Sequence, residues 1–415
     1  MGSMIHLAVG SLEIDWGKNY NYSDHSPLYQ IHDVTNVPYF YLDDANFSGD
    51  EDNWEIIVEQ KEGLSKPLHE IIERIELLGH TFEYCKKEFL YLSEFYGFEV
   101  AKFNFEQLHK ALSTVDVTCV SPDYGQGGED FGKFFRREIF PRLELSELVD
   151  DPIYVQFQAS EGMESLTPYT ILSLLSGNPS AQNLPVNWAF KDLEENGWAK
   201  KEDFVKPLDQ ENRFLIVTEG TSDSKIIKHA FDILKPHVSD FFDYIDMDKG
   251  YPFSGTGNLV NFVKGLVSIG IQNNVIVLFD NDAEGVASFN RCNNLSIPEN
   301  MRILKLPELA AFNNFETFGP DGNTQSNVNG LAISIECYLD LKDDAQIRWN
   351  SYNKLIKGYQ GELIAKDRYK KEFLNQRSHV ENYDYSKIET VLNMIIKNCV
   401  SIKENTLNRA LDNQK

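Results

Sequence analysis

Residues 275–285, VIVLFDNDAEG, decide the fold of the C-terminal half of the chain. Five apolar residues come in a row, and Asp280 and Asp282 follow directly, with Glu284 and Gly285 behind them. A short apolar run of this kind is typical of a strand that is buried on both faces of a parallel sheet. The pattern therefore predicts a buried strand over 274–282 that ends in carboxylates.

The segments around this strand alternate between strand and helix patterns. Strands are predicted over 213–220, 241–247 and 302–306, and helices over 222–234 and 254–270. Alternation of strand and helix is the pattern of a parallel α/β sheet. The expected fold class of this half is therefore α/β, with a Rossmann-like parallel sheet.

Carboxylates follow two of these predicted strands. Glu219 ends the first strand, and Asp280 and Asp282 end the third. Functional groups of a parallel sheet gather at the carboxyl ends of its strands, and residues i and i+2 of an extended chain point to the same side. Asp223 lies four residues after Glu219, in the first turn of a predicted helix, and can return toward the same place. The four side chains are therefore predicted to form one acidic site.

Crowded carboxylates have a chemical consequence. Their charges repel one another, so at least one pKa rises unless a cation lies among them. Oxygen ligands select Mg²⁺, Mn²⁺ or Ca²⁺ rather than zinc. Two such ions about 4 Å apart activate a water and stabilise both oxygens of a phosphoryl displacement. The sequence thus predicts a Mg²⁺ or Mn²⁺ site for phosphodiester chemistry, and the alternative is that Asp280 and Asp282 form a solvated turn or a helix cap.

The motifs EGTSD over 219–223 and DNDAEG over 280–285 resemble those of the Toprim domain of topoisomerases, primases and OLD-family nucleases. The GTG turn over 255–257 resembles the loop after the second Toprim strand. In that family the glutamate and the two aspartates of the motifs hold Mg²⁺. The resemblance therefore implies a Toprim metal site formed by Glu219, Asp280 and Asp282.

OLD-type nucleases add a further acidic residue and a lysine downstream of these motifs. The segment NGLAISIECYL over 329–339 offers Glu336 for the first, and YQGELIAKDRYKKEF over 359–373 offers Lys366 for the second. Both residues are expected on helices. The alternative for each is a solvated helix face with no role in catalysis.

The whole chain resembles a bacterial HEPN/Toprim-associated protein. The pieces that carry this resemblance are RIELLGHTFEYCKKEF (74–89), LPVNWAFKDLEENGW (184–198), FGPDG (318–322) and RWNSYNKLIKGYQGE (348–362). It implies an α-rich, HEPN-like N-terminal domain before the Toprim domain, a homo-oligomer and a role in antiphage defence. No GxxxxGK[ST] occurs, so the P-loop of OLD proteins is missing and any ATPase would be a partner protein.

HEPN ribonucleases carry an arginine and a histidine four to six residues apart, and Arg74 and His80 satisfy that spacing. Six helical residues turn through about 600°, which leaves the two side chains on rather different faces of a helix. The alternative is that Arg74 is a solvated side chain and that His80 ends or caps a turn.

The expected domain organisation follows from these patterns. A mainly helical N-terminal domain is predicted over 4–205, a Toprim domain over 209–345 and a helical extension over 346–415. Within the first, a strand pair is expected over 4–16, and residues 17–60 are expected to be loops with short strands. Helices are expected over 65–95, 105–112, 131–140, 167–176 and 186–195.

Composition limits the function classes. The chain has 415 residues and a net charge of −25, which argues against tight, sequence-independent coating of nucleic acid because such binding depends on Lys and Arg. Five scattered cysteines without a CxxC pair indicate neither zinc nor a disulfide framework, so a reducing cytoplasm is expected. No apolar run is long enough for a membrane span, and neither a membrane span nor a secretory signal is expected. Met1-Gly2-Ser3 is interpreted as a cloning remnant before a natural start at Met4.

Three hypotheses follow from the sequence. The first is a Mg²⁺-dependent Toprim nuclease that cuts DNA or RNA, with Lys366 neutralising charge in the transition state. The second is a regulatory subunit that binds metal without turnover, or that a partner protein activates. The third is a metal-independent HEPN ribonuclease that acts through Arg74 and His80.

Overall fold

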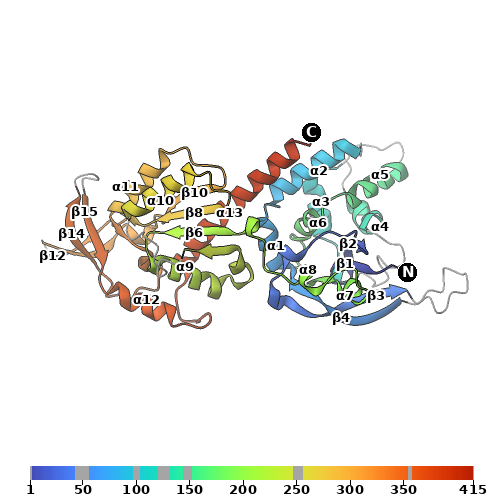
Figure 1. Ribbon diagram of the computed structural model, residues 1–415, viewed down its shortest axis with the longest axis horizontal. Coiled ribbons are helices and arrows are strands. Elements are labelled where there is room, and N and C mark those ends of the chain that lie inside the picture. The colour runs from blue at the N-terminus through green and yellow to red at the C-terminus, as the bar shows by residue number, and fades with distance from the viewer. Residues whose placement is uncertain are drawn as a thin grey trace, which may run out of the picture. The chain divides into compact units, whose positions relative to one another are not determined.

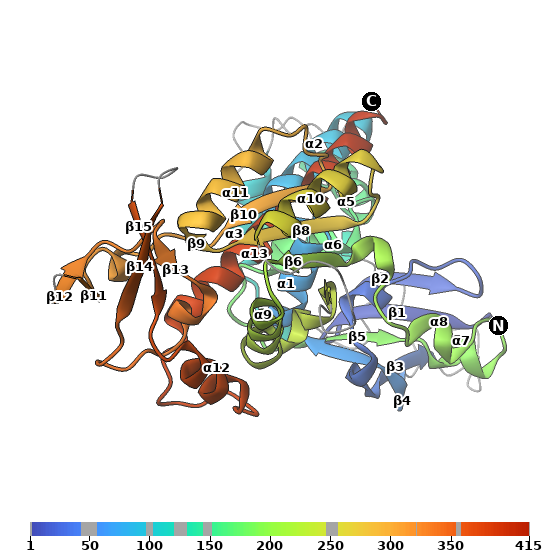
Figure 2. The ribbon, with the colours of Figure 1, turned by 60° about the vertical axis from the view of Figure 1, so that its left-hand side comes forward.

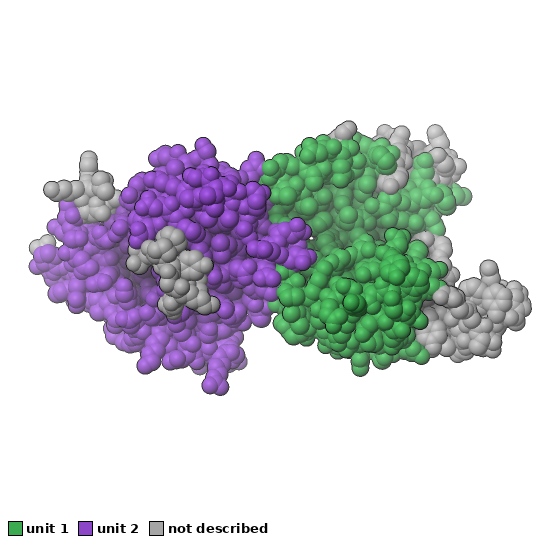
Figure 3. Space-filling model, viewed as in Figure 1, with its two compact units in different colours: residues 1–208, 403–415 green, residues 209–402 purple. Residues whose placement is uncertain are grey.

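The computed structural model of the chain describes residues 2–42, 56–96, 103–119, 131–143, 152–245, 256–320, 322–353 and 358–414 (Figure 1). It divides into two compact units, which Figure 3 shows in different colours. Unit 1 comprises Met1–Leu208 and Lys403–Lys415, and unit 2 comprises Asp209–Ile402. The long helix α13, Ser386–Asp412, contributes residues to both.

Unit 1 is built on a five-stranded antiparallel sheet with the order β2-β1-β5-β4-β3. Its strands are β1 Met4–Val9, β2 Leu12–Lys18, β3 Val34–Leu42, β4 Ile56–Pro67 and β5 Pro185–Ala189. The strand pair expected over 4–16 is confirmed, since β1 pairs with β2 around a turn in which Gly10 has a φ of +59°. Residues 17–60 were expected to be loops with short strands, and this is wrong for β3 and the start of β4, because these two strands pair along nine residues.

Helices of unit 1 cover this sheet and fill the space between its connections. They are α1 Leu68–Leu77, α2 Phe82–Tyr96, α3 Phe105–Leu112, α4 Phe131–Phe134, α5 Pro152–Glu164, α6 Pro168–Leu175, α7 Lys191–Glu195 and α8 Lys201–Phe204. A π-helical turn, Phe135–Ile139, continues α4. The helices expected over 105–112, 131–140 and 167–176 are therefore present, the second of them partly as a π-helix.

Two helix predictions in unit 1 need correction. The helix expected over 65–95 is broken at Gly79, whose φ of +99° is left-handed and ends α1. The helix expected over 186–195 begins instead as strand β5, which hydrogen-bonds to β1 on one side and β4 on the other. Val186 and Trp188 are buried there, so apolar residues whose spacing also suits a helix are held in a strand by pairing on both sides.

Unit 2 contains a parallel sheet with the order β10-β8-β6-β7. Its strands are β6 Phe214–Thr218, β7 Phe242–Tyr244, β8 Asn274–Phe279 and β10 Met301–Lys305, all pairing in parallel. The connecting helices are α9 Thr221–Leu234, α10 Thr256–Ser268 and α11 Ala283–Asn293. The predicted parallel α/β fold of this half is therefore confirmed, with every residue of β8 buried.

Helices cover both faces of the parallel sheet. Figures 1 and 2 show α10 and α11 on one face and α9 on the other. Val263 and Leu266 of α10 pack with Val275 and Val277 of β8 in the main core of this unit. Because helices cover both faces of this sheet, functional side chains are expected at the carboxyl ends of its strands.

A second sheet follows the parallel one in the chain, with the order β12-β11-β14-β15. Its strands are β11 Phe315–Gly319, β12 Gly322–Ser326, β14 Ile347–Asn353 and β15 Gly358–Leu363. The expectation of a helical extension from residue 346 is therefore wrong at its start, because β14 pairs with both β11 and β15. Helices resume only at α12 Lys366–Leu374 and α13, so this second sheet extends across residue 345, the boundary predicted for the Toprim domain.

Several general features complete the description. No helix in the described parts of the chain is long and apolar enough to cross a membrane. Cys85, Cys292, Cys337 and Cys399 are buried free thiols.

Candidate active site

Glu219 is held at the carboxyl edge of the parallel sheet by hydrogen bonds from two other elements. It directly follows β6, and its Oε1 accepts from the backbone N–H of Asp280 at 3.1 Å. Its Oε2 accepts from the Oγ1 of Thr256, the first residue of α10, at 2.7 Å. Burial raises the pKa of Glu219 to about 7, and these hydrogen bonds offset the burial only in part. Thr256 belongs to the GTG turn noted in the sequence, and Gly255 lies outside the described residues.

Asp280 and Asp282 follow β8 and have different surroundings. The Oδ1 of Asp282 accepts from the N–H of Gly285 at 2.7 Å, so this carboxylate caps α11. Asp282 therefore forms a helix cap through its Oδ1, an arrangement that the sequence also allowed. Asp280 has no such cap, and burial followed by repulsion from Asp223 and Glu219 raises its pKa well above the usual value. Asp280 is thus a buried carboxyl group that faces several other carboxylates.

Asp223 reaches the same site from the first turn of α9. Its Oδ2 accepts from the backbone N–H of Gly220 at 3.0 Å, which closes that turn. Burial raises the pKa of Asp223 to about 7, and the Glu336 carboxylate is the next largest cause. Lys366 acts in the opposite direction and lowers the same pKa. The pKa of Asp223 in α9 is therefore set in part by Glu336 and Lys366, which come from distant parts of the chain.

Glu336 is brought to the site by a short strand pairing that the sequence did not reveal. Strand β13, Ala332–Ile333, pairs antiparallel with β9, Asn281–Asp282, directly after β8. The next turn, Ile335–Tyr338, is a 3₁₀ helix that holds Glu336 with only 5% of its surface exposed. Its Oε2 accepts from the Ser334 hydroxyl at 2.7 Å. Glu336 is therefore not on a solvated helix face, and the α-helix expected for it is a single 3₁₀ turn.

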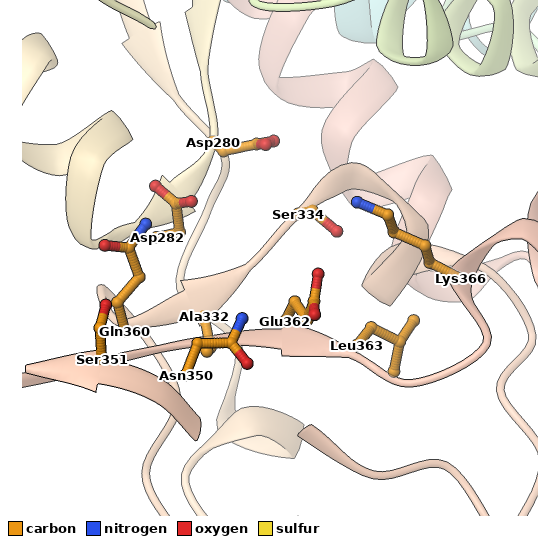
Figure 4. A pocket seen from close by; sticks show the side chains of 11 residues that line it. Asp280, Asp282, Ala332, Ser334, Asn350, Ser351, Gln360, Glu362, Leu363 and Lys366 are labelled. Atoms are coloured by element: carbon orange, nitrogen blue, oxygen red, sulfur yellow. The ribbon is translucent and has the colours of Figure 1, made fainter. Parts of the chain in front are cut away.

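Lys366 is the first residue of α12, so its expected helical position is confirmed. The preceding Ala365 has a φ of +58°, which turns the chain sharply into the helix. Helix α12 is fixed to α9 by the ring of His229, which lies 3.1 Å from the carbonyl oxygen of Phe373, itself fully buried. This anchoring places the Lys366 ammonium over the cavity beside the carboxylates (Figure 4).

A cavity of about 300 Å³ lies in front of these residues (Figure 4). Asp280, Asp282 and Lys366 line one side, with Ser334 between them. The opposite wall is the β14–β15 hairpin, which contributes polar side chains that sequence reasoning missed: Asn350, Ser351, Gln360 and Glu362. The alternation of polar and apolar residues in IRWNSYN was a detectable strand signal for this wall.

The donor set suits a hard divalent cation. Burial, and secondarily repulsion between the carboxylates, raises their pKa values here, and Mg²⁺ or Mn²⁺ would relieve that repulsion. Within the described ranges, however, no three His, Cys, Asp or Glu side chains lie close enough together to hold an ion. Several carboxylate oxygens accept backbone N–H groups instead, from Gly220, Asp280 and Gly285. The carboxylates are therefore suitable ligands for a divalent ion, but their side chains must turn toward one another to bind it.

Arg74 and His80 belong to unit 1. Arg74 is fully buried near the end of α1, and its guanidinium donates to the carbonyl oxygens of Pro27 at 3.1 Å and Tyr29 at 3.0 Å. His80 follows the break at Gly79 and packs edge-on against the Tyr84 and Tyr169 rings. These contacts indicate a structural role for Arg74, which is not the solvated side chain that was the alternative.

Replacing Arg74 by methionine is expected to destabilise unit 1 by about 3 kcal/mol. The change leaves one buried and one partly buried carbonyl oxygen without this donor, and each such loss costs on the order of 1–3 kcal/mol. Urea unfolding measures the effect, with the exposed Arg142→Met in the same unit as the control. Equal unfolding midpoints for the two variants would contradict the structural role of Arg74.

The burial of His80 predicts that the stability of the folded protein falls in mild acid. Burial, and secondarily the Lys403 charge, lower the pKa of His80 from 6.5 to about 4. The unfolded chain then binds a proton between about pH 6.5 and 4 that the folded chain does not, so stability is lost as the pH falls through this window. At about pH 5 the expected loss is about 2 kcal/mol relative to neutral pH.

The measurement is urea unfolding of the wild type and His80→Gln at neutral pH and in mild acid. The glutamine variant is expected to lose less stability on acidification, and the exposed His32→Gln is expected to match the wild type. An identical acid response of all three proteins would show that His80 titrates normally.

Comparison with known proteins gives one match. The family model described as HEPN/Toprim N-terminal domain 1 matches residues 1–212, half of the chain. No curated protein and no solved structure matches the sequence. The matched residues end at the start of unit 2, and the carboxylates described above lie in the residues that follow.

Proposed function

Because the chain belongs to the HEPN/Toprim N-terminal domain 1 family, we propose that unit 2 is a Toprim-type domain and that the protein is a divalent-metal-dependent nuclease. The observation that carries this proposal is the cluster of buried carboxylates beside Lys366 at the ends of β6 and β8. Carboxylates that perturb one another inside a cavity are characteristic of a functional site. The substrate is DNA or RNA.

Each residue of the site has a proposed role. Glu219, Asp280 and Asp282 hold Mg²⁺ or Mn²⁺, and Asp223 and Glu336 support a second ion or orient water. A bound divalent ion would supply activation of the attacking water and neutralisation of the scissile phosphate. The Lys366 ammonium stabilises the negative charge that develops on the phosphate in the transition state. The cavity positions the phosphate between Lys366 and the carboxylates.

One observation favours a second candidate function, a partner-activated or regulatory subunit. The carboxylates are engaged with backbone N–H groups, and no three of the described ligand side chains converge on one point. The chain itself has no P-loop, so an ATPase would be a separate partner protein. Binding of such a partner is proposed to drive the rearrangement that brings the carboxylates together. The proposed setting for either function is bacterial antiphage defence, which rests on the resemblance of the sequence to HEPN/Toprim-associated proteins.

Incubation of the purified protein with plasmid DNA and with transfer RNA, in Mg²⁺, Mn²⁺ or EDTA, tests the proposal. The nuclease is expected to cut at least one substrate only with metal, and Asp280→Asn/Asp282→Asn is expected to cut neither. Cleavage that survives both EDTA and the double substitution would place the active site in the N-terminal half of the chain instead. Metal binding without cleavage would support the regulatory subunit.

A further inference from the structure

The cavity wall opposite the carboxylates carries neutral amides rather than cations. Asn350 and Gln360 project from the β14–β15 hairpin, and Figure 4 shows the Gln360 side chain pointing from the hairpin toward Asp282. Strand β15 packs beside β13, which pairs with the strand of Asp282, and beside α11, the helix that Asp282 caps. The β14–β15 hairpin therefore lies next to the carboxylates of the site.

The strand register explains why these side chains face the cavity. Ser351 pairs with Gln360, and the register shifts between Trp349 and Ser351, so Asn350 is the extra residue of a β-bulge. A bulge re-aims a side chain, and such bulges are over-represented next to active sites. Gln360 and Glu362 are two residues apart and therefore share a face. The bulge thus places Asn350 and Ser351 together on the face of Gln360 and Glu362, which gives this wall an additional polar side chain.

The two amides have donors and acceptors to offer a ligand. Among the described residues, neither the Asn350 nor the Gln360 side chain has a hydrogen-bond or ion-pair partner. A primary amide presents a donor and an acceptor side by side, which is the pattern that pairs with nucleobase edges. Ser351 and Ser334 add hydroxyls to the same cavity. The lining therefore matches a base or a sugar better than it matches a bare phosphate chain.

An exposed aromatic ring lies on the same face of this sheet. Phe318 of β11 pairs in parallel with Arg348 of β14, and Arg348 pairs with Glu362 of β15. Paired residues point to the same side of a sheet, so Phe318 shares the face of Glu362. Its ring is 44% exposed. Nucleobases stack on exposed rings of this kind without regard to sequence.

The size of the cavity and the net charge of the chain both favour an unpaired nucleotide as the ligand. A cavity of about 300 Å³ is of the size that holds a small ligand, and an unpaired nucleotide fits this class where a duplex does not. The net charge of −25 also weakens binding through phosphates, which supplies most of the affinity for intact duplexes. Contacts to bases and sugars must then contribute a larger share of the affinity.

Building on the nuclease function proposed above, we infer that the substrate is single-stranded nucleic acid and that Asn350 and Gln360 hydrogen-bond the unpaired nucleotide next to the scissile phosphate. Phe318 stacks on a neighbouring base. The two amides contact either the base or the ribose 2′-hydroxyl of this nucleotide. Because DNA lacks that hydroxyl, equal binding of DNA and RNA strands indicates a contact with the base, and tighter binding of RNA indicates a contact with the hydroxyl.

The test measures binding in the absence of turnover, so that it is independent of cleavage. Fluorescence anisotropy is recorded with Asp280→Asn protein in Mg²⁺ and with labelled oligonucleotides of one sequence: unpaired DNA, unpaired RNA and the DNA duplex. The test variant adds Asn350→Ala/Gln360→Ala to this background. The matched control adds Asn290→Ala/Asn293→Ala, which removes two exposed amides near the C-terminal end of α11. A further variant adds Phe318→Ala.

Unpaired strands are expected to bind about tenfold more tightly than the duplex, and the test variant is expected to lose about tenfold in affinity for them. The control variant should stay within about twofold of its parent, and Phe318→Ala should weaken binding without changing the preference between DNA and RNA. Equal affinity for duplex and unpaired strand, equal affinity of test and control variants, or no binding of any strand would each overturn the inference. Absence of cleavage by the wild type would overturn the nuclease proposal and leave this binding result to stand by itself.

Discussion

Asp280→Asn is expected to lower metal-dependent cleavage by about 10²–10³-fold or more, the range observed when one strong transition-state contact is removed. Asp280 is the residue on which the repulsion of Asp223, Glu219, Asp282 and Glu336 converges. An amide of the same shape keeps the packing but binds a divalent ion poorly. The Asp280→Asn protein is therefore expected to fold correctly and to lose cleavage activity.

The same substitution is expected to leave the metal-free protein as stable as the wild type, or more stable. Burial and neighbouring carboxylates disfavour the charged form of Asp280, and a neutral amide removes that repulsion. Thermal unfolding in EDTA, measured beside cleavage rates, separates the two effects. The control is Asp343→Asn, an exposed aspartate of the same unit that should change neither quantity. An Asp280→Asn protein that cuts at the wild-type rate, or that fails to fold, would contradict the assignment.

Gly285→Ala is the second substitution with a large expected effect. Gly285 lies in the first turn of α11, where an added Cβ would be 2.3 Å from the carbonyl oxygen and 2.9 Å from the carbonyl carbon of Asp280. Backbone atoms cannot swing aside as a flexible side chain does, so Asp280 must shift. We expect a destabilisation of about 1–3 kcal/mol, together with loss of cleavage because the shifted residue no longer faces its partners.

Gly265→Ala is the matched control for that change. Gly265 lies within α10 at an exposed position, and nothing lies within 4 Å of its added Cβ. Alanine at an open helix position is expected to stabilise the protein by about 0.5–1 kcal/mol. Urea unfolding and cleavage rates of both variants test the pair. Full activity or unchanged stability of Gly285→Ala would show that the glycine of the DNDAEG motif has no steric role beside Asp280. Destabilisation by Gly265→Ala would contradict the gain expected at an open helix position.

The parallel sheet and its carboxyl edge were predictable because their signals are local. The apolar run before Asp280 is long enough to predict a strand, and its residues are indeed all buried. The rule that strand ends meet at one edge then predicted that Glu219 would lie near Asp280, and a hydrogen bond of 3.1 Å joins them.

The other half of the site depends on pairings between distant segments. Glu336 reaches the cluster only because two residues of β13 pair with β9, a contact too short to leave a sequence pattern. The Asn350 and Gln360 wall depends on a bulged hairpin, and the register of a strand is set by its partner rather than by its own composition. In unit 1, strand β5 likewise adopts its conformation from neighbours on both sides. Local patterns therefore revealed the parallel sheet, while tertiary pairing determined these features.

The measurement that tests the central claim most directly is equilibrium binding of Mn²⁺ at neutral pH, followed by the electron paramagnetic resonance signal of the free ion. The wild type is expected to bind Mn²⁺ and to lose it to excess Mg²⁺, whereas Asp280→Asn should bind far more weakly and Asp343→Asn should match the wild type. Equal Mn²⁺ binding by the wild type and Asp280→Asn, or no binding by the wild type, would contradict the claim that these buried carboxylates form a divalent-metal site.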